Sequence, residues 1–117
     1  MQGDKCLRKV AKALASVLKR SSDFFGRFGG EEFAAILPNT DYENATKVAE
    51  QLRKCIAELK MVHEQSPTAP YITISLGAAT ITPTLNTSFL ELISAADQKL
   101  YQAKSQGRNQ VQAVQLF

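Results

Sequence analysis

Residues 27–33, Arg27-Phe28-Gly29-Gly30-Glu31-Glu32-Phe33, decide the fold of this chain. Short apolar segments, 24–28 and 33–37, lie on either side of the glycine pair, and Pro38 ends the second. Two such segments around a Gly-Gly connection are typical of a β-hairpin, because glycine tolerates the dihedral angles of a tight turn. The glycines also let a ligand approach the backbone, and carboxylates are groups that Mg²⁺ prefers. On physical grounds alone, such a hairpin is more often a simple turn than a site.

The two adjacent carboxylates are expected to differ in role. Glu31 and Glu32 are neighbours in the sequence, and successive side chains of an extended chain point to opposite faces. One of them can therefore bind a metal ion while the other does something different.

The remaining segments predict three helices and two further strands. Apolar residues at helical spacing predict a helix over 5–19, with Asp4 as its N-cap, and a second helix over 41–60. A β-branched run predicts a strand over 71–80, followed by a helix from Ser88 to about residue 105 that Gly107 ends, and a last strand over 110–116. The order α-β-β-α-β-α-β predicts an α+β domain, with helices on one face of a mainly antiparallel sheet.

Length and charge set the class of protein. With 117 residues, 44% of them hydrophobic and 21% charged, we expect a single folded domain over 1–117. The sequence has no apolar run of membrane-spanning length and no signal-like segment at its start, so a cytoplasmic location is expected. Residues 1–27 carry seven basic and two acidic residues, a balance of +5. Such a face can attract phosphates or a membrane surface, although a solvated helix face is the more common reason for this pattern.

Four motifs, in order along the chain, resemble the GGDEF family of diguanylate cyclases. The stretch 27–33 is similar to the signature of that family. Around it stand a Gly-Asp-x-x-Leu helix start at 3–7, a Thr-x-Ser-x-Gly-x-Ala strand at 73–79 and an Ala-Asp-x-x-Leu-Tyr-x-Ala-Lys-x-x-Gly-Arg-Asn helix end at 96–109. The resemblance covers essentially the whole chain, and it implies the ferredoxin-like, palm-type fold of nucleotide cyclases.

Members of that family condense two GTP molecules into cyclic di-GMP in bacterial signalling, and each of two domains presents one GTP. The resemblance implies that Glu31 binds Mg²⁺ and helps to activate the attacking 3′-hydroxyl, and that Glu32 is a second catalytic candidate. It further implies that the backbone of Gly29 and Gly30 lies against the nucleotide. Asp4 would contact the guanine edge, where a carboxylate accepts hydrogen bonds from ring and amino N–H groups.

Lys104 and Arg108 are the expected phosphate ligands. They lie four residues apart, one in the last turn of the last predicted helix and one just past it, so that both can reach one triphosphate. Without the resemblance, the favoured interpretation would be cations that complement the dipole at a helix C-terminus.

Arg20 and Asp23 resemble the Arg-x-x-Asp inhibitory site at which members of the family bind cyclic di-GMP. An arginine offers a planar fork to phosphate or guanine, and an aspartate accepts from a guanine edge. Some members add a further arginine from the following helix; the matching position here is Gln51, with Arg53 nearby, so this part of the site departs from the pattern.

A second departure concerns the metal site. The Asp-x-Asp motif that supplies the family's other metal-binding aspartate occurs nowhere in the 117 residues, so Mg²⁺ would lack its second protein ligand. The family's first strand, which lies centrally between the hairpin and the strand at 71–80, is also without a counterpart. We therefore expect an N-terminally truncated domain that is inactive alone and self-associates, as a homodimer or by domain swapping, because unpaired strand edges invite pairing. We also expect sensory domains upstream in the parent protein, which could be tethered to a membrane with this domain on the cytoplasmic side.

Three readings compete at this point. The first is the core of a cyclase that takes GTP as substrate. The second is a degenerate module that binds cyclic di-GMP as a receptor without catalysis; the intact hairpin motif with Lys104 and Arg108 argues against it. The third, a palm-like nucleic-acid binder, is weakest because the basic residues lack interleaved aromatics that stack bases, so nucleic acid is not an expected partner.

Overall fold

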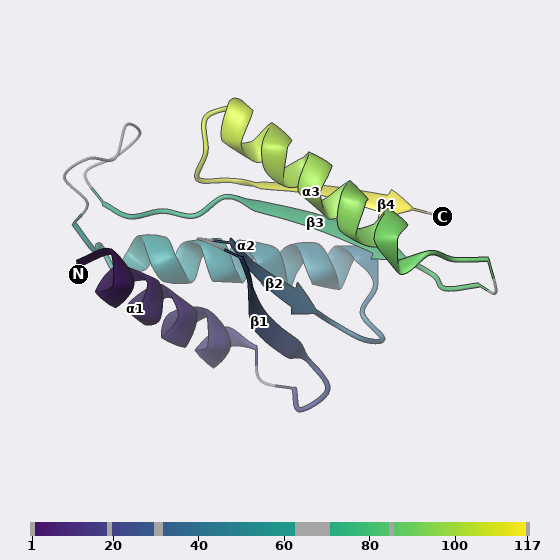
Figure 1. Cartoon of the computed structure of the whole chain (residues 1–117), viewed down its shortest axis with the longest axis horizontal. Helices are drawn as coiled ribbons and strands as arrows, with labels where there is room; N and C mark the ends of the chain where they lie inside the picture. The colour runs from purple at the N-terminus through teal and green to yellow at the C-terminus, as the bar shows by residue number, and fades with distance from the viewer. Residues whose placement is uncertain (1, 19, 30–31, 63–70, 85, 117) are drawn as a thin grey trace. The chain divides into compact units, whose positions relative to one another are not determined.

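The computed structural model describes residues 2–18, 20–29, 32–62, 71–84 and 86–116. They divide into two compact units, Met1–Asn39 and Thr40–Phe117. The elements follow in the predicted order α-β-β-α-β-α-β, which confirms the α+β class (Figure 1). Within the described ranges, no helix combines the length and apolar character needed to cross a membrane.

The first unit consists of helix α1 (Gln2–Val17) and the strands β1 (Phe24–Gly29) and β2 (Glu32–Ile36). The two strands pair antiparallel, with Phe24 opposite Ile36 and Arg27 opposite Phe33, so the predicted hairpin is confirmed. The register is irregular between Arg27 and Gly29, at the end that leads into the glycine pair. Such an irregularity bends a strand and changes the direction of the residues at its tip.

Helix α1 has the predicted apolar stripe but a different start. Val10 and Leu14 lie four residues apart and are buried, as helical spacing requires. The helix begins at Gln2, so the prediction that Asp4 caps it is wrong. Asp4 lies in the first turn instead.

The second unit opens with helix α2 (Tyr42–Glu58). The Asp41 side chain caps it by accepting a hydrogen bond from the Asn44 backbone N–H at 2.8 Å. Its buried face is formed by Ala49, Leu52 and Ile56, which recur at three- and four-residue intervals as predicted.

The second strand pair is parallel. Strands β3 (Leu76–Ile81) and β4 (Val111–Leu116) run side by side, with Leu76 opposite Val111, and helix α3 (Phe89–Ser105) connects them. A mainly antiparallel sheet was expected, but a helix between two strands provides the long crossover that parallel pairing needs. Both α2 and α3 pack on this pair, and Figure 1 draws them above and below it. Successive residues of β3 are all half-buried, which indicates cover on both faces and refines the predicted one-sided arrangement.

Strand β3 is shorter than predicted. Residues 72–75 belong to the predicted strand but lie outside β3, and Tyr71 makes only an isolated bridge to Val62. The physical reason is the partner: β4 begins opposite Leu76, so in the described residues the chain before that point has no ladder to join. Ser88 caps α3 as predicted, accepting from Leu90 N–H at 3.2 Å, and Gly107 follows its end with φ of 120°.

Candidate functional site

The predicted site residues are divided between the two units. Asp4, Arg20, Asp23, Gly29 and Glu32 belong to Met1–Asn39, whereas Lys104 and Arg108 belong to Thr40–Phe117. Gly30 and Glu31, the predicted nucleotide contact and metal ligand, lie outside the described residues.

The hairpin tip carries one acidic residue opposite a glycine. Gly29, the last residue of β1, pairs with Glu32, the first residue of β2. Glu32 is exposed, so its carboxylate is accessible to solvent and ligands. This places the second acidic residue of the motif where the backbone carries no side chain across from it.

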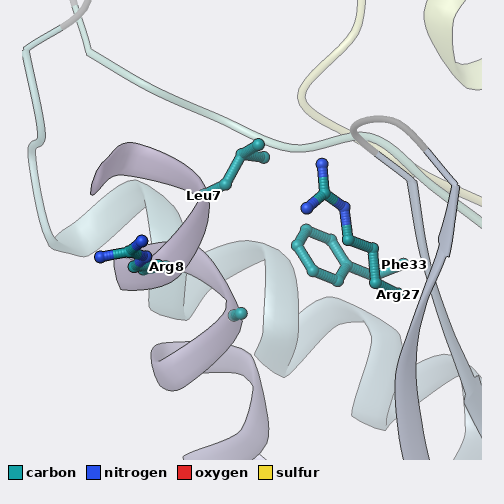
Figure 2. Close-up of a pocket in the computed structure, with 5 residues that line it drawn as sticks. Leu7, Arg8, Arg27 and Phe33 are labelled. Atoms are coloured by element: carbon teal, nitrogen blue, oxygen red, sulfur yellow. The ribbon is translucent and has the colours of Figure 1, made fainter. Parts of the chain in front are cut away.

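One face of the hairpin is stiffened by aromatic residues. Phe25 and Phe33 stack with ring centroids 5.5 Å apart and an interplanar angle of 15°. Arg27 lies directly across the ladder from Phe33, and Figure 2 shows its side chain beside the Phe33 ring. Stacked rings on neighbouring strands hold each other in place.

A cavity of about 350 Å³ lies between this hairpin face and α1. In Figure 2, Leu7 extends from α1 toward Arg27 and Phe33. The lining combines two cations with apolar surface, and it consists of Leu7, Arg8, Ala11, Arg27 and Phe33. Apolar walls with a few polar groups are typical of small-molecule pockets. Asp4, the predicted guanine contact, lies on α1 one turn before Leu7.

Arg20 and Asp23 are brought together, as the motif predicts. Arg20 donates to Asp23 Oδ1 from both Nη2, at 2.6 Å, and Nε, at 3.0 Å, and also donates from Nη2 to the Pro38 carbonyl at 2.9 Å. The hydrogen bonds to Asp23 raise the pKa of the Arg20 guanidinium above its usual value. The Arg20 side chain is 47% exposed and that of Asp23 only 6%, so Arg20 is the group that meets solvent.

Lys104 and Arg108 lie where α3 ends. Lys104 is in its last turn, and Arg108 follows Gly107 in a turn that the Arg108 N–H closes on the Ala103 carbonyl at 2.9 Å. Both side chains are exposed. The predicted arrangement is thus present, with Lys104 in the last helical turn and Arg108 just past the helix.

Sequence reasoning missed the residues that hold this turn. Arg53 donates from Nη1 to Asn109 Oδ1 at 3.0 Å, and the Asn109 backbone N–H donates to Ser75 Oγ at 3.2 Å. Arg53 also pairs with Glu50, whose pKa is lowered by the hydrogen bonds from the guanidinium. Arg53, considered above as a neighbour of Gln51 in a product site, is therefore engaged with the turn after α3. The Gly-Arg-Asn sequence after a helix was the available signal, since it indicates a turn with left-handed residues.

A metal cage is not evident in the part of the chain that the structure describes. No three His, Cys, Asp or Glu residues there cluster so as to hold a metal ion. Glu32 offers one carboxylate, whereas Mg²⁺ requires six oxygen ligands in octahedral geometry. The described residues therefore do not fit a complete Mg²⁺ site by themselves.

Comparison with known proteins identifies the family. The model of the diguanylate cyclase GGDEF domain family matches residues 1–110. Diguanylate cyclase A of Treponema denticola is 37% identical over 109 residues, 93% of this chain and 28% of that protein. Diguanylate cyclase DgcM of Escherichia coli K12 is 37% identical over 112 residues, 96% of this chain and 25% of that protein. The chain thus spans less than a third of the length of these curated relatives.

Solved structures agree with this fold. The active GGEEF domain of a diguanylate cyclase from Vibrio cholerae superposes with a TM-score of 0.81 and 32% identity, over 98% of this chain and 70% of that one. The coiled coil and GGDEF domain of DgcB from Caulobacter crescentus, in complex with c-di-GMP, gives a TM-score of 0.81 and 29% identity, over 97% of this chain and 58% of that one.

Proposed function

Since this chain belongs to the GGDEF family of diguanylate cyclase domains, we propose that it forms half of a site that makes cyclic di-GMP. It would hold one GTP while a second domain presents the other. The observation that carries this proposal is the family match over residues 1–110, which includes both the hairpin motif and the turn with Lys104 and Arg108.

The cavity of the first unit is the proposed place for the guanine base. Leu7, Ala11 and Phe33 give it apolar walls, against which a flat base can pack. Asp4, one turn earlier on α1, is the proposed acceptor for the N–H groups of the guanine edge. The backbone of Gly29 and Gly30 would lie against the nucleotide.

The exposed cations after α3 are proposed to hold the triphosphate. Arg108 can bind phosphate oxygens through two parallel N–H groups, and Lys104 adds a point charge. Cations at this position offset the charge that develops during phosphoryl transfer. Their exposure supports the proposal, because neither side chain needs to be uncovered before it can bind.

Glu31 and Glu32 are the proposed catalytic carboxylates, with Glu31 as the metal ligand. When bound, Mg²⁺ would neutralise phosphate charge. Because the sequence contains no Asp-x-Asp motif to supply a second carboxylate, we propose that an additional ligand from outside these 117 residues is required. The chain alone is then expected to make no cyclic di-GMP from GTP and Mg²⁺, and accumulation of product in that assay would refute this point.

Arg20 and Asp23 are the proposed product site. Arg20 is held by Asp23 and by the Pro38 carbonyl, so its guanidinium is already oriented. The Asp23 side chain is only 6% exposed and its Oδ1 accepts both hydrogen bonds from Arg20, so its carboxylate must leave this pairing to reach a guanine edge. We propose that Arg20 makes the first contact with cyclic di-GMP and that Asp23 binds after the pair opens.

Self-association is proposed from the strand edges. In the described residues β2 pairs only with β1, and β3 only with β4, so each has a second edge without a ladder. Such edges readily add a strand from another chain. Sedimentation velocity at several concentrations tests this, and a monomer at all of them would contradict it.

Calorimetric titration of the chain with GTP, cyclic di-GMP and ATP tests the proposed function. We expect binding of the two guanine ligands and much weaker binding of ATP. The oriented Arg20–Asp23 pair also favours a second candidate, a cyclic di-GMP receptor without catalysis. Binding of cyclic di-GMP without GTP would select that receptor, and binding of neither would refute both candidates.

A further inference from the structure

The turn that carries Arg108 has an unusual backbone. Three successive residues have positive φ angles: Gly107 at 120°, Arg108 at 63° and Asn109 at 48°. Glycine adopts such angles freely and asparagine tolerates them, but arginine rarely does. A left-handed arginine persists only where the surrounding structure holds it in place.

The contacts that hold this turn come from segments far apart in the sequence. The side chain of Asn109 accepts from Arg53 on α2, and its backbone N–H donates to Ser75, just before β3. Asn109 is thus fixed at two points, immediately after Arg108. Gln110 adds a side-chain N–H that donates to the Arg108 carbonyl at 3.2 Å.

Arg53 is itself held rigidly. Its Nε donates to Glu50 Oε1 at 2.9 Å, and its Nη2 donates to the same carboxylate, so one edge of the guanidinium faces Glu50. The remaining Nη1 is then aimed at Asn109. The Arg53 side chain is only 19% exposed, which limits its alternative positions. A lysine would offer one ammonium group in place of this two-sided fork.

We propose that Arg53 is a positioning residue of the triphosphate site, holding the turn through Asn109 in the conformation that presents Arg108 to phosphate. This inference rests on the proposed function, because it takes Arg108 to be a phosphate ligand. Arg53 does not touch the nucleotide in this account. Its effect passes through one hydrogen bond to Asn109, the residue that follows Arg108 in the chain.

A double-mutant cycle on the full chain tests the proposal. GTP affinity is measured by calorimetry for the wild type, Arg53→Gln, Arg108→Ala and the double variant. We expect Arg53→Gln to weaken GTP binding on the order of tenfold in the wild-type background, and to have no further effect when Arg108 is absent. Equal weakening in both backgrounds, or none in either, would overturn the proposal, because a merely structural role does not depend on Arg108.

Asn109→Gly provides a second variant, whose result does not depend on whether the Arg53→Gln variant folds correctly. Glycine keeps the left-handed backbone but removes the oxygen that Arg53 binds, so it should weaken GTP binding as Arg53→Gln does. Lys47→Gln is the matched control, because it removes a positive charge from an exposed position of α2 outside the network. GTP binding by Lys47→Gln should equal that of the wild type; a comparable loss there would mean that net charge, not Arg53, is responsible.

Hydrogen exchange gives a readout that needs no ligand. Arg53→Gln should accelerate exchange of the Asn109 amide, while the Leu76 amide, which donates to the Gln110 carbonyl at 3.0 Å, stays protected. Unchanged Asn109 exchange would refute the positioning role. If Arg108→Ala leaves GTP affinity unchanged, the proposed phosphate role of Arg108 is wrong and the positioning proposal falls with it. If Arg108→Ala weakens binding and Arg53→Gln does not, only the positioning proposal is wrong.

Discussion

The hairpin and the β3–β4 pair are both two-stranded, but they differ in what covers them. Helices α2 and α3 pack on β3 and β4, and every residue of β3 is half-buried. In β2 four of the five residues are exposed, and Phe24 and Ile36 of the hairpin are 60% and 42% exposed. The difference separates a covered strand pair, which should contribute most of the stability, from an exposed hairpin, at whose tip Glu32 is accessible.

Gly26 in the hairpin and Gly77 in β3 should show the largest difference between the two strand pairs. A Cβ at Gly77 would lie 2.2 Å from the Ala96 carbonyl oxygen and 2.3 Å from the Leu100 nitrogen, both in the backbone of α3. Gly77→Ala should therefore lower the free energy of unfolding by about 3 kcal/mol or more. A Cβ at Gly26 would meet only the Phe24 ring, at 3.2 Å. That ring can turn away, so Gly26→Ala should cost less than about 1 kcal/mol in urea denaturation.

A matched pair of isoleucines gives the next largest effect. Ile56 is completely buried on α2, whereas Ile36 of the hairpin is 42% exposed. Ile56→Ala should cost about 2–5 kcal/mol in the free energy of unfolding, because it leaves a cavity. Ile36→Ala should cost below about 1 kcal/mol, since solvent already reaches the side chain. Similar losses for the two variants would contradict the proposed separation.

The N-cap of α2 should contribute a smaller share. Asp41→Ala removes the acceptor for the Asn44 N–H and should cost about 1 kcal/mol. Asp41→Asn keeps an acceptor oxygen and should be almost neutral, which makes it the control in the same thermal denaturation experiment. If Asp41→Asn costs as much as Asp41→Ala, charge rather than the capping bond is responsible.

The smallest expected effect is a pH dependence of the stability of the second unit, Thr40–Phe117. Hydrogen bonds from Arg53 lower the pKa of Glu50 in the folded state, so folding is favoured once the carboxylate is ionised. This contribution is fully present above the unfolded pKa of about 4.3 and is lost as the pH falls through the lower folded value. Glu50→Gln should thus lower stability at pH 7 but not at pH 2, as measured by denaturant titration. Equal losses at both pH values would contradict the linkage.

Local patterns predicted the elements better than they predicted their partners. Ser88 and Gly107 mark the start and the end of α3 as expected, because helix caps depend on a few neighbouring residues. The late start of the β3 ladder, at Leu76, depends on where β4 begins, 35 residues later, so a β-branched run alone overestimated the strand. The Asp4 cap was wrong because Asp is compatible with both the cap and the first helical turn.

The same difference applies to the candidate site: a contact between near neighbours in the sequence was predictable, whereas a contact between distant segments was not. Arg20 and Asp23 pair over three residues, so their contact follows from the motif. The bond from Arg53 to Asn109 spans 56 residues, and no periodicity or spacing rule connects them. The resemblance implied which residues would bind phosphate, but only the fold indicated that Arg53 holds the turn next to them.

The central claim is that one unit binds product and the other binds the phosphates of the substrate. Calorimetric titration of Arg20→Ala and Arg108→Ala with both GTP and cyclic di-GMP tests it most directly. We predict that Arg20→Ala loses cyclic di-GMP and keeps GTP, whereas Arg108→Ala loses GTP and keeps cyclic di-GMP. Loss of both ligands in each variant, or of neither ligand in either variant, would contradict the account.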